Sequence, residues 1–291
     1  MTLQLNFTAN ALSLYSAAEQ QMFHDGLDFW SGIVTGYRDG VSRTWTLEVD
    51  AFDEAASGGV VRLGSARPEN LTLTGVVADS HLSTTSTDNP FGQRFIIAQE
   101  GFAEFNVNAD AGTLSELTIR HEIGHAMGIG SLWENNELHN DGVSGNSNRT
   151  LVGGTPGEYV GALALAEYQQ EFGLPMADFI PVELDGGGGT AGGHWNEVAD
   201  NPRSENVIGF DTDPGDEGPA PVVAGGVNEG ESFDDELMSG VRSGSGFLSN
   251  TTVASLYEIG FTVQGFTPIP EPTVGVLLGF GLGCCLRRRR S

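Results

Sequence analysis

The amino-acid sequence predicts an α+β fold, and three patterns lead to that expectation. Apolar residues recur at the spacing of an amphipathic helix over 16–34, alternate with polar residues from Thr44 to Phe52, and form a second helical stripe before Gly128. Helices before and after a group of strands are typical of a sheet with helices packed against it.

The N-terminal part is expected to contain one helix followed by several strands. Ser16 is the expected N-cap of the helix at 16–34. The apolar residues of this helix are Ala18, Met22, Phe23, Leu27, Trp30 and Ile33. Besides Thr44–Phe52, strands are expected at 60–63, 71–77, 95–98 and 102–107.

The most informative motif of the chain is His121-Glu122-Ile123-Gly124-His125-Ala126-Met127-Gly128. Two histidines four positions apart lie on one face of a helix, so both imidazoles can bind one Zn²⁺. Glu122 lies beside them, placed to accept a proton from a water molecule. This HExxH arrangement is typical of zinc hydrolases. The alternative is a solvated helical face rich in histidine and glutamate.

Local signals also favour a helix at this motif. Thr113 and Glu116 form a candidate capping box at its start, and Gly128 and Gly130 are expected to end it. Its apolar stripe consists of Ile119, Ile123, Ala126 and Met127. The stripe should pack into the core, whereas the two histidines should face a cleft.

A catalytic zinc site normally has three protein ligands and one water molecule, so a third ligand is required. His24 in the first helix and His81 in a polar stretch are both expected to be surface or satisfied histidines. His139 follows the motif closely and is near enough in sequence to reach the metal, but its polar loop is expected to be solvated. His194 follows a run of glycines, which lets the backbone turn freely.

The motif resembles that of metzincin metallopeptidases of the leishmanolysin type. The segment from His121 to Gly128 matches the first eight residues of HExxHxxGxxH, but Ser131 stands at the position of the third histidine. Leishmanolysin-like enzymes displace that histidine downstream by a long insertion, and here 68 residues separate His125 from His194.

A second part of the resemblance lies downstream of this insertion. Residues 236–240 read Glu-Leu-Met-Ser-Gly and are similar to the methionine turn of the family, and residues 247–261 are similar to the helix that follows it. The resemblance implies that Met238 is the hydrophobic base beneath the metal. The alternative is an ordinary core methionine.

The resemblance also implies ligands and a catalytic residue. His121, His125 and His194 would bind one catalytic Zn²⁺, and Glu122 would be the general base and general acid.

The implied fold is a peptidase domain over 1–265. Its upper lobe, about 1–130, would contain a twisted mixed β-sheet with helices and the active-site helix. Its lower lobe, about 131–265, would be irregular and helical.

The composition excludes several classes of partner. The chain has 39 acidic and 13 basic residues, all of the basic ones arginine, and a formal net charge of −26. Nucleic acid and anionic membrane surfaces are therefore poor partners. Cys284 and Cys285 are the two cysteines, which excludes a disulfide scaffold in the body of the chain.

One more helix and an acidic loop are expected after the motif. The helix should span 156–172, and residues 211–236 should form a surface loop rich in Gly, Pro, Asp and Glu. Candidate ligands for Ca²⁺ in that loop are Asp211, Asp213, Asp216 and Glu217. Their spacing matches no EF-hand, which favours a solvated acidic loop.

Residues 266–291 are expected to form a sorting tail. It contains Pro270-Glu271-Pro272, a mostly apolar run over 273–286, and the basic cluster at 287–290. This order resembles the PEP-CTERM sorting signal of Gram-negative bacteria. The resemblance implies export to the cell envelope or extracellular matrix, transient membrane association and processing by an exosortase. No N-terminal signal peptide is visible in residues 1–10.

The sequence therefore predicts an exported zinc-dependent endopeptidase that acts on protein or peptide substrates. Glu122 would take a proton from water and give it to the leaving amine. Two alternatives stay open. One is a non-catalytic, zinc-containing surface or matrix protein. The other is a gluzincin-type hydrolase that uses Glu134 or Glu137 as the third ligand.

Overall fold

The largest element of the protein is a four-stranded mixed sheet with the strand order β1-β3-β5-β4. The computed structural model describes residues 1–56, 62–74, 95–108, 112, 114–139, 157–184, 191–196, 220–240 and 245–266. The strands of the sheet are β1 (Thr2–Phe7), β3 (Thr44–Phe52), β4 (Gly64–Leu73) and β5 (Ile96–Asn106). The first three in space are parallel, and β4 runs antiparallel at the edge. The expected α+β class is confirmed.

The strand predictions are confirmed for β3 and need correction elsewhere. In β3, Trp45, Leu47 and Val49 are buried and alternate with less buried residues, as the sequence pattern predicts. The segments 95–98 and 102–107, predicted as two strands, lie in one strand, because β5 pairs with β3 on one side and β4 on the other. Strand β4 begins at Gly64, so the described residues 62–63 of the strand predicted at 60–63 lie before it, and it ends at Leu73, so only residues 71–73 of the strand predicted at 71–77 belong to it. Residues 60–61 and 75–77 lie outside the described residues, and β1 was not predicted.

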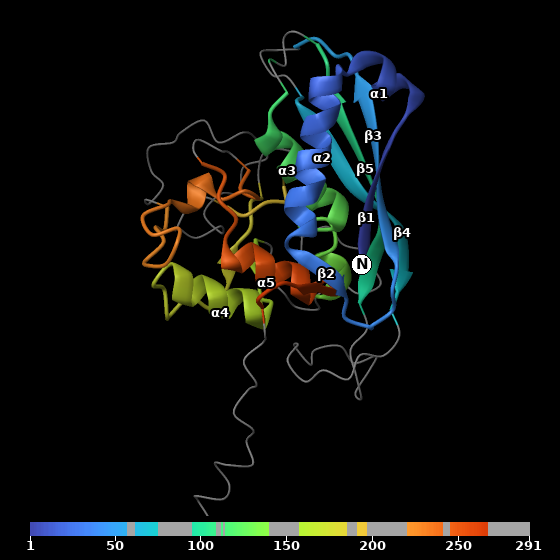
Figure 1. The fold of residues 1–291 in the computed structure, drawn as a ribbon. Coiled ribbons are helices and arrows are strands. Elements are labelled where there is room, and N and C mark those ends of the chain that lie inside the picture. Colours follow the sequence, from blue (N-terminus) through green and yellow to red (C-terminus); the bar gives the residue numbers. More distant parts are fainter. Residues whose placement is uncertain are drawn as a thin grey trace, which may run out of the picture.

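Helices cover one face of the sheet (Figure 1). The chain passes from β1 through the short helix α1 (Ala9–Leu14) into α2 (Ala17–Ser31), and α3 (Glu116–Met127) lies beside α2. The predicted N-cap of α2 is confirmed: Ser16 and Glu19 form a reciprocal capping box.

Two glycines let α3 approach its neighbours closely. A Cβ atom on Gly26 of α2 would lie 2.8 Å from the Ile119 side chain of α3. A Cβ atom on Gly101 of β5 would lie 2.8 Å from that of Ala126. The apolar stripe of α3 is buried, as predicted, and these contacts fix the helix between α2 and the sheet.

The C-terminal part consists of short elements. They are the 3₁₀ helix Glu134–Asn136, β6 (Glu158–Tyr159), α4 (Ala162–Glu171), β7 (Ile180–Pro181), the 3₁₀ helix Phe233–Asp235, α5 (Asn250–Glu258) and β8 (Phe261–Val263). Helices α4 and α5 lie side by side (Figure 1). Strand β8 returns to the N-terminal half, where it pairs antiparallel with β2 (Val34–Tyr37).

The helix predicted at 156–172 is shorter than expected. Residues 158–159 pair with β7, so the helix begins only after Gly161. The helix predicted at 247–261, after the segment 236–240 that carries Met238 (the methionine segment), is confirmed as α5. Its N-cap is Ser249, and Gly260 follows it with a φ of +104°.

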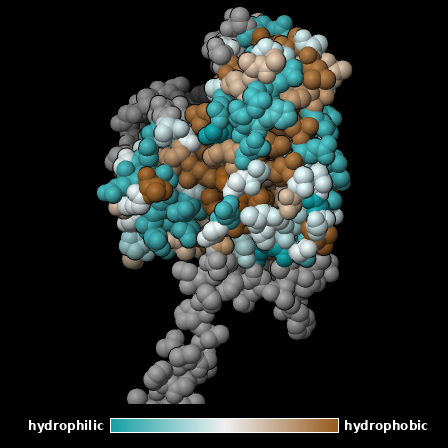
Figure 2. All heavy atoms as spheres, viewed as in Figure 1, coloured by the Kyte–Doolittle hydropathy of each residue, from teal (hydrophilic) through white to brown (hydrophobic). Residues whose placement is uncertain are grey.

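Figure 2 shows hydrophobic side chains gathered between the sheet half and the C-terminal elements, with hydrophilic residues around them. Among the described residues, no helix is long and apolar enough to cross a lipid bilayer. His81, the candidate calcium ligands at 211, 213, 216 and 217, and the predicted tail beyond Phe266 lie outside the described residues.

Candidate metal centre

Helix α3 carries the HExxH motif, and its ends are set by capping groups. The N-cap is Ser115, whose side chain accepts a hydrogen bond from the backbone N–H of Thr118. The prediction of Thr113 as the cap is wrong, because the helix begins at Glu116 and the residue just before it reaches the first free N–H groups. Gly128 ends the helix in the left-handed conformation, with a φ of +116°, as predicted.

The side chains of His121, His125 and His194 converge on one point. The Nε2 atom of His125 lies 3.0 Å from that of His121 and 2.9 Å from that of His194, and the remaining pair is 3.1 Å apart. Their exposed fractions are 5%, 7% and 6%. The histidine face of α3 is thus covered rather than open, since the His194 ring stacks on that of His121.

The outer ring nitrogens define how these rings are protonated. Nδ1 of His121 lies 2.7 Å from the carbonyl oxygen of Leu237, and Nδ1 of His125 lies 3.0 Å from that of Ile129. A carbonyl oxygen only accepts, so each Nδ1 is assigned the proton, and in the neutral ring Nε2 then keeps a lone pair. Lone pairs that face each other repel, so the spacing of these atoms favours a cation between them.

The spacing also fits a metal ion. Nitrogen atoms that bind one tetrahedral ion at about 2.0–2.1 Å are about 3.3 Å apart. The three histidines can place their ligand atoms within 4.8 Å of one another, and they are the cluster of this kind within the described part of the chain. The residues present therefore fit a metal with three imidazole ligands. The hydrogen bonds from the outer nitrogens hold two of the rings in the required orientation.

His194 reaches α3 because two backbone segments approach without side chains between them. Gly130 has a φ of +72°, and a Cβ atom on it would lie 2.0 Å from the carbonyl oxygen of Gly193. On the other side, Glu183 N donates to the carbonyl of His194 at 3.0 Å, and Gly192 N donates to the carbonyl of Glu183 at 2.7 Å. The turn that presents His194 is therefore held from both sides.

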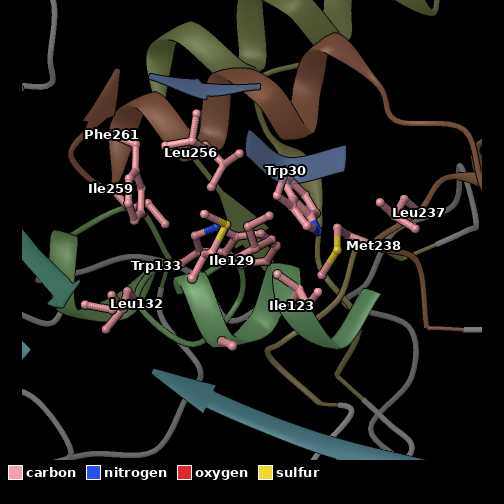
Figure 3. Close-up of a cluster of buried hydrophobic side chains, with 14 of the residues drawn as sticks. Trp30, Ile123, Ile129, Leu132, Trp133, Leu237, Met238, Leu256, Ile259 and Phe261 are labelled. Atoms are coloured by element: carbon pink, nitrogen blue, oxygen red, sulfur yellow. The ribbon is translucent and has the colours of Figure 1, made fainter. Parts of the chain in front are cut away.

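Met238 lies directly against the motif helix. It is fully buried, and a Cβ atom on Gly124 would lie 2.7 Å from its sulfur. Figure 3 shows Met238 beside Trp30 and α3. The preceding residue, Leu237, provides the carbonyl that contacts His121. Residues 237–238 thus touch α3 at two points, Gly124 and His121.

Glu122 lies on α3 next to the edge strand of the sheet. Its side chain is half-buried, and a Cβ atom on Gly64, the first residue of β4, would lie 3.4 Å from its Cγ. The side chain of Glu122 is therefore close to the start of β4.

The other candidate ligands do not join the cluster. His24 lies on α2 and contacts an aromatic ring. Glu134 is the first residue of the 3₁₀ helix after α3, and Glu137 is the C-cap of that 3₁₀ helix. The metal-binding group within the described residues contains neither of them. The expectation that His139 is solvated is wrong, since its exposed fraction is 1%. The chain before it folds into turns that pack against Val160.

A buried polar network behind the histidines was not predicted. Its centre is Glu236, two residues before Met238, which is fully buried. Burial raises the pKa of Glu236 to about 7, while hydrogen bonds from Thr252, Met238 and Ser249 oppose that rise. The sequence signal for this role is weak. Asp234 and Asp235 precede Glu236, and a run of acidic residues is more typical of a solvated loop.

No family model matches this chain, and no curated protein matches it. The geometry of the site therefore defines its class: a buried cluster of three histidines that could hold a metal ion.

Proposed function

We propose that the protein is a zinc-dependent endopeptidase of the leishmanolysin-like metzincin type. The observation that carries the proposal is the convergence of three Nε2 atoms, 2.9–3.1 Å apart, beside a glutamate that follows the first of these histidines directly. Structural zinc sites are closed by four protein ligands, whereas catalytic sites have three and leave one position open.

The nature of the ligands favours zinc. Three imidazoles suit Zn²⁺, and also Cu, Fe and Ni, whereas Mg²⁺ and Ca²⁺ prefer oxygen. Three histidines with an adjacent HExxH glutamate are the ligand and base set of a zinc hydrolase. The mixed sheet, the motif helix against it and Met238 behind the motif are also compatible with the metzincin arrangement.

The residues of the chain have distinct roles in the proposed reaction. A bound zinc ion would lower the pKa of a water molecule and polarise the scissile carbonyl group. Glu122 would accept the proton of the water and then pass it to the leaving amine.

The position of strand β4 favours a peptide as the substrate. This strand is one of the two edge strands of the sheet, and its first residue, Gly64, lies next to Glu122. An extended peptide that adds to this edge would gain backbone hydrogen bonds. The carbonyl groups of the bound peptide would then lie near Glu122, the proposed base.

The location of the protein is part of the proposal. The sequence beyond Phe266 resembles a PEP-CTERM signal and supports export to the envelope or matrix of a Gram-negative bacterium. An exosortase would process this tail after transient association with the membrane.

The test combines metal analysis with a protease assay. We expect purified protein to contain about one zinc ion per chain and to cleave a generic protein substrate, with loss of cleavage in a chelator. Glu122→Gln should retain zinc and lose nearly all cleavage, because the amide cannot accept the proton. Glu116→Gln, the same change six residues earlier on α3, is the matched control and should remain active.

Three results separate the proposal from its alternatives. Zinc binding without cleavage by the wild-type protein would favour a non-catalytic zinc protein. Unchanged cleavage by Glu122→Gln would refute the assigned mechanism. Retention of zinc by His194→Ala would favour a gluzincin-type site with Glu134 or Glu137 as the third ligand.

A further inference from the structure

The carboxylate of Glu236 is buried behind the histidine cluster and accepts four hydrogen bonds. Its Oε2 accepts from the backbone N–H of Met238. Its Oε1 accepts from the backbone N–H of Ser249 at 3.1 Å, from the Ser249 hydroxyl at 2.9 Å and from the Thr252 hydroxyl at 2.7 Å. None of the ion pairs among the described residues involves Glu236.

One path leads from this carboxylate to His194. The Thr252 hydroxyl that donates to Glu236 accepts a hydrogen bond from the indole Nε1 of Trp195 at 2.8 Å. Trp195 directly follows His194, and its backbone N–H donates to the carbonyl of Met238 at 3.1 Å. Its ring also stacks on that of Trp133, with ring centroids 4.2 Å apart. The residue next to the third histidine is therefore held by hydrogen bonds to groups that Glu236 itself binds.

A second path leads to His121. By accepting from Met238 N, Glu236 fixes the backbone on both sides of Leu237. The carbonyl of Leu237 lies 2.7 Å from Nδ1 of His121 and orients that ring. Two of the three histidines, which are 73 positions apart in the sequence, thus depend on the same carboxylate.

We propose that Glu236 is a positioning residue, which sets the orientation of His121 and the location of His194 so that their Nε2 atoms meet at one metal ion. The inference rests on the proposed metal site and does not require peptidase activity. A carboxylate suits this role because every group around it is a donor, so both oxygens are needed as acceptors. A neutral amide would turn an N–H₂ group toward one of these donors and break the arrangement.

Glu258, the last residue of α5, provides a matched control. It is also a buried glutamate and accepts from the Tyr159 hydroxyl at 2.6 Å and from Leu163 N at 2.7 Å. It lies at the C-terminal end of α5, whereas Ser249 and Thr252 lie at the N-terminal end. None of its hydrogen bonds leads to a histidine of the cluster or to the segment that carries Met238. A purely structural role for Glu236 predicts similar behaviour of Glu236→Gln and Glu258→Gln.

The experiment measures metal affinity rather than catalysis. Zinc affinity of the wild-type protein and of both variants is measured by competition with a chromophoric chelator, and circular dichroism reports folding. The visible spectrum of the Co²⁺-substituted proteins reports ligand geometry. We expect Glu236→Gln to bind zinc about 10–100-fold more weakly and to change the Co²⁺ spectrum. Glu258→Gln should keep both the affinity and the spectrum of the wild type.

A pair of milder variants covers the case in which Glu236→Gln does not fold. Thr252→Val removes the hydroxyl between Glu236 and Trp195 with little change in shape, and Thr252→Ser keeps it. We expect weaker zinc binding for Thr252→Val and near wild-type binding for Thr252→Ser. Equal affinity for these two folded variants would overturn the path to His194.

The outcomes also separate this inference from the proposed function. If folded Glu236→Gln keeps the wild-type affinity and Co²⁺ spectrum, the positioning role is refuted and the peptidase proposal stands. If the wild-type protein binds zinc without cleaving peptides, the peptidase proposal fails and the affinity comparison still decides the role of Glu236. If the wild-type protein binds neither metal, both fail.

Discussion

The sulfur of Met238 lies against the position that a side chain on Gly124 would occupy. A Cβ atom on Gly124 would come within 2.7 Å of the Met238 sulfur and 3.0 Å of its methyl carbon. Gly124 is the residue before His125 in the motif, and Figure 3 shows the methionine beside α3. The absence of a side chain inside the HExxH motif is therefore what allows the methionine segment to contact the helix.

This contact makes Gly124→Ala an overpacking substitution. Alanine improves helix propensity by about 1 kcal/mol, but overpacking a dense core costs about 1–3 kcal/mol. We expect the free energy of unfolding, measured in urea, to fall by about 1 kcal/mol. Combination with Met238→Ala should show a smaller total loss than the sum of the two single variants, because the shorter side chain makes room. Additive losses would argue against a clash at this contact.

Gly130→Ala should displace the third histidine. The substitution places a Cβ atom 2.0 Å from the Gly193 carbonyl oxygen, and backbone cannot move aside as a flexible side chain can. Gly40 is a matched control with the same φ of +72° and no atom within 4 Å of its Cβ position. We expect zinc affinity to fall at least tenfold in Gly130→Ala and to stay unchanged in Gly40→Ala. A similar affinity in both variants would show that only backbone strain matters.

Glu258 should make stability depend on pH in a defined direction. Burial raises its pKa to about 7, from an ordinary value of 4.5 in the unfolded chain. The folded state therefore binds the proton more tightly, and the resulting stabilisation is present below about pH 4.5 and is lost as the pH rises to about 7. The free energy of unfolding of the wild type minus that of Glu258→Gln should fall by up to about 3 kcal/mol across this range. A difference that is flat or rises with pH would contradict the assignment.

Metal removal should destabilise the protein. An ion that binds only the folded state, at a free concentration of about 1,000 times its Kd, adds about 4 kcal/mol to the free energy of unfolding. We expect a chelator to lower the Tm of the wild type in differential scanning calorimetry and to have much less effect on His194→Ala. Equal shifts for the two proteins would place the bound metal elsewhere.

Several features of the site follow from the sequence alone. The spacing of His121 and His125 puts both rings on one face of α3, because four residues make slightly more than one helical turn. The end of this helix at Gly128 is predictable for a similar reason, since it depends on residues adjacent in the chain. The same is true of Ser16 as the N-cap of α2.

Other features were decided by contacts between distant segments. The β5 strand is continuous because it has a partner on each side, which its own sequence does not reveal. His139 is buried although its neighbours are polar, because the chain around it folds back onto residue 160. The role of Glu236 depends on donors that follow it by 13 and 16 positions, whereas Glu236 itself ends a segment whose composition resembles a solvated loop.

The sequence by itself thus determined a helix with two histidines and a glutamate on it, together with its end at Gly128, because these depend on residues close together in the chain. The tertiary structure decided the convergence of His194 with this pair, the contact between Met238 and Gly124, and the buried carboxylate behind them. Those relationships depend on close packing of segments far apart in the chain, and local periodicity does not specify how such segments meet.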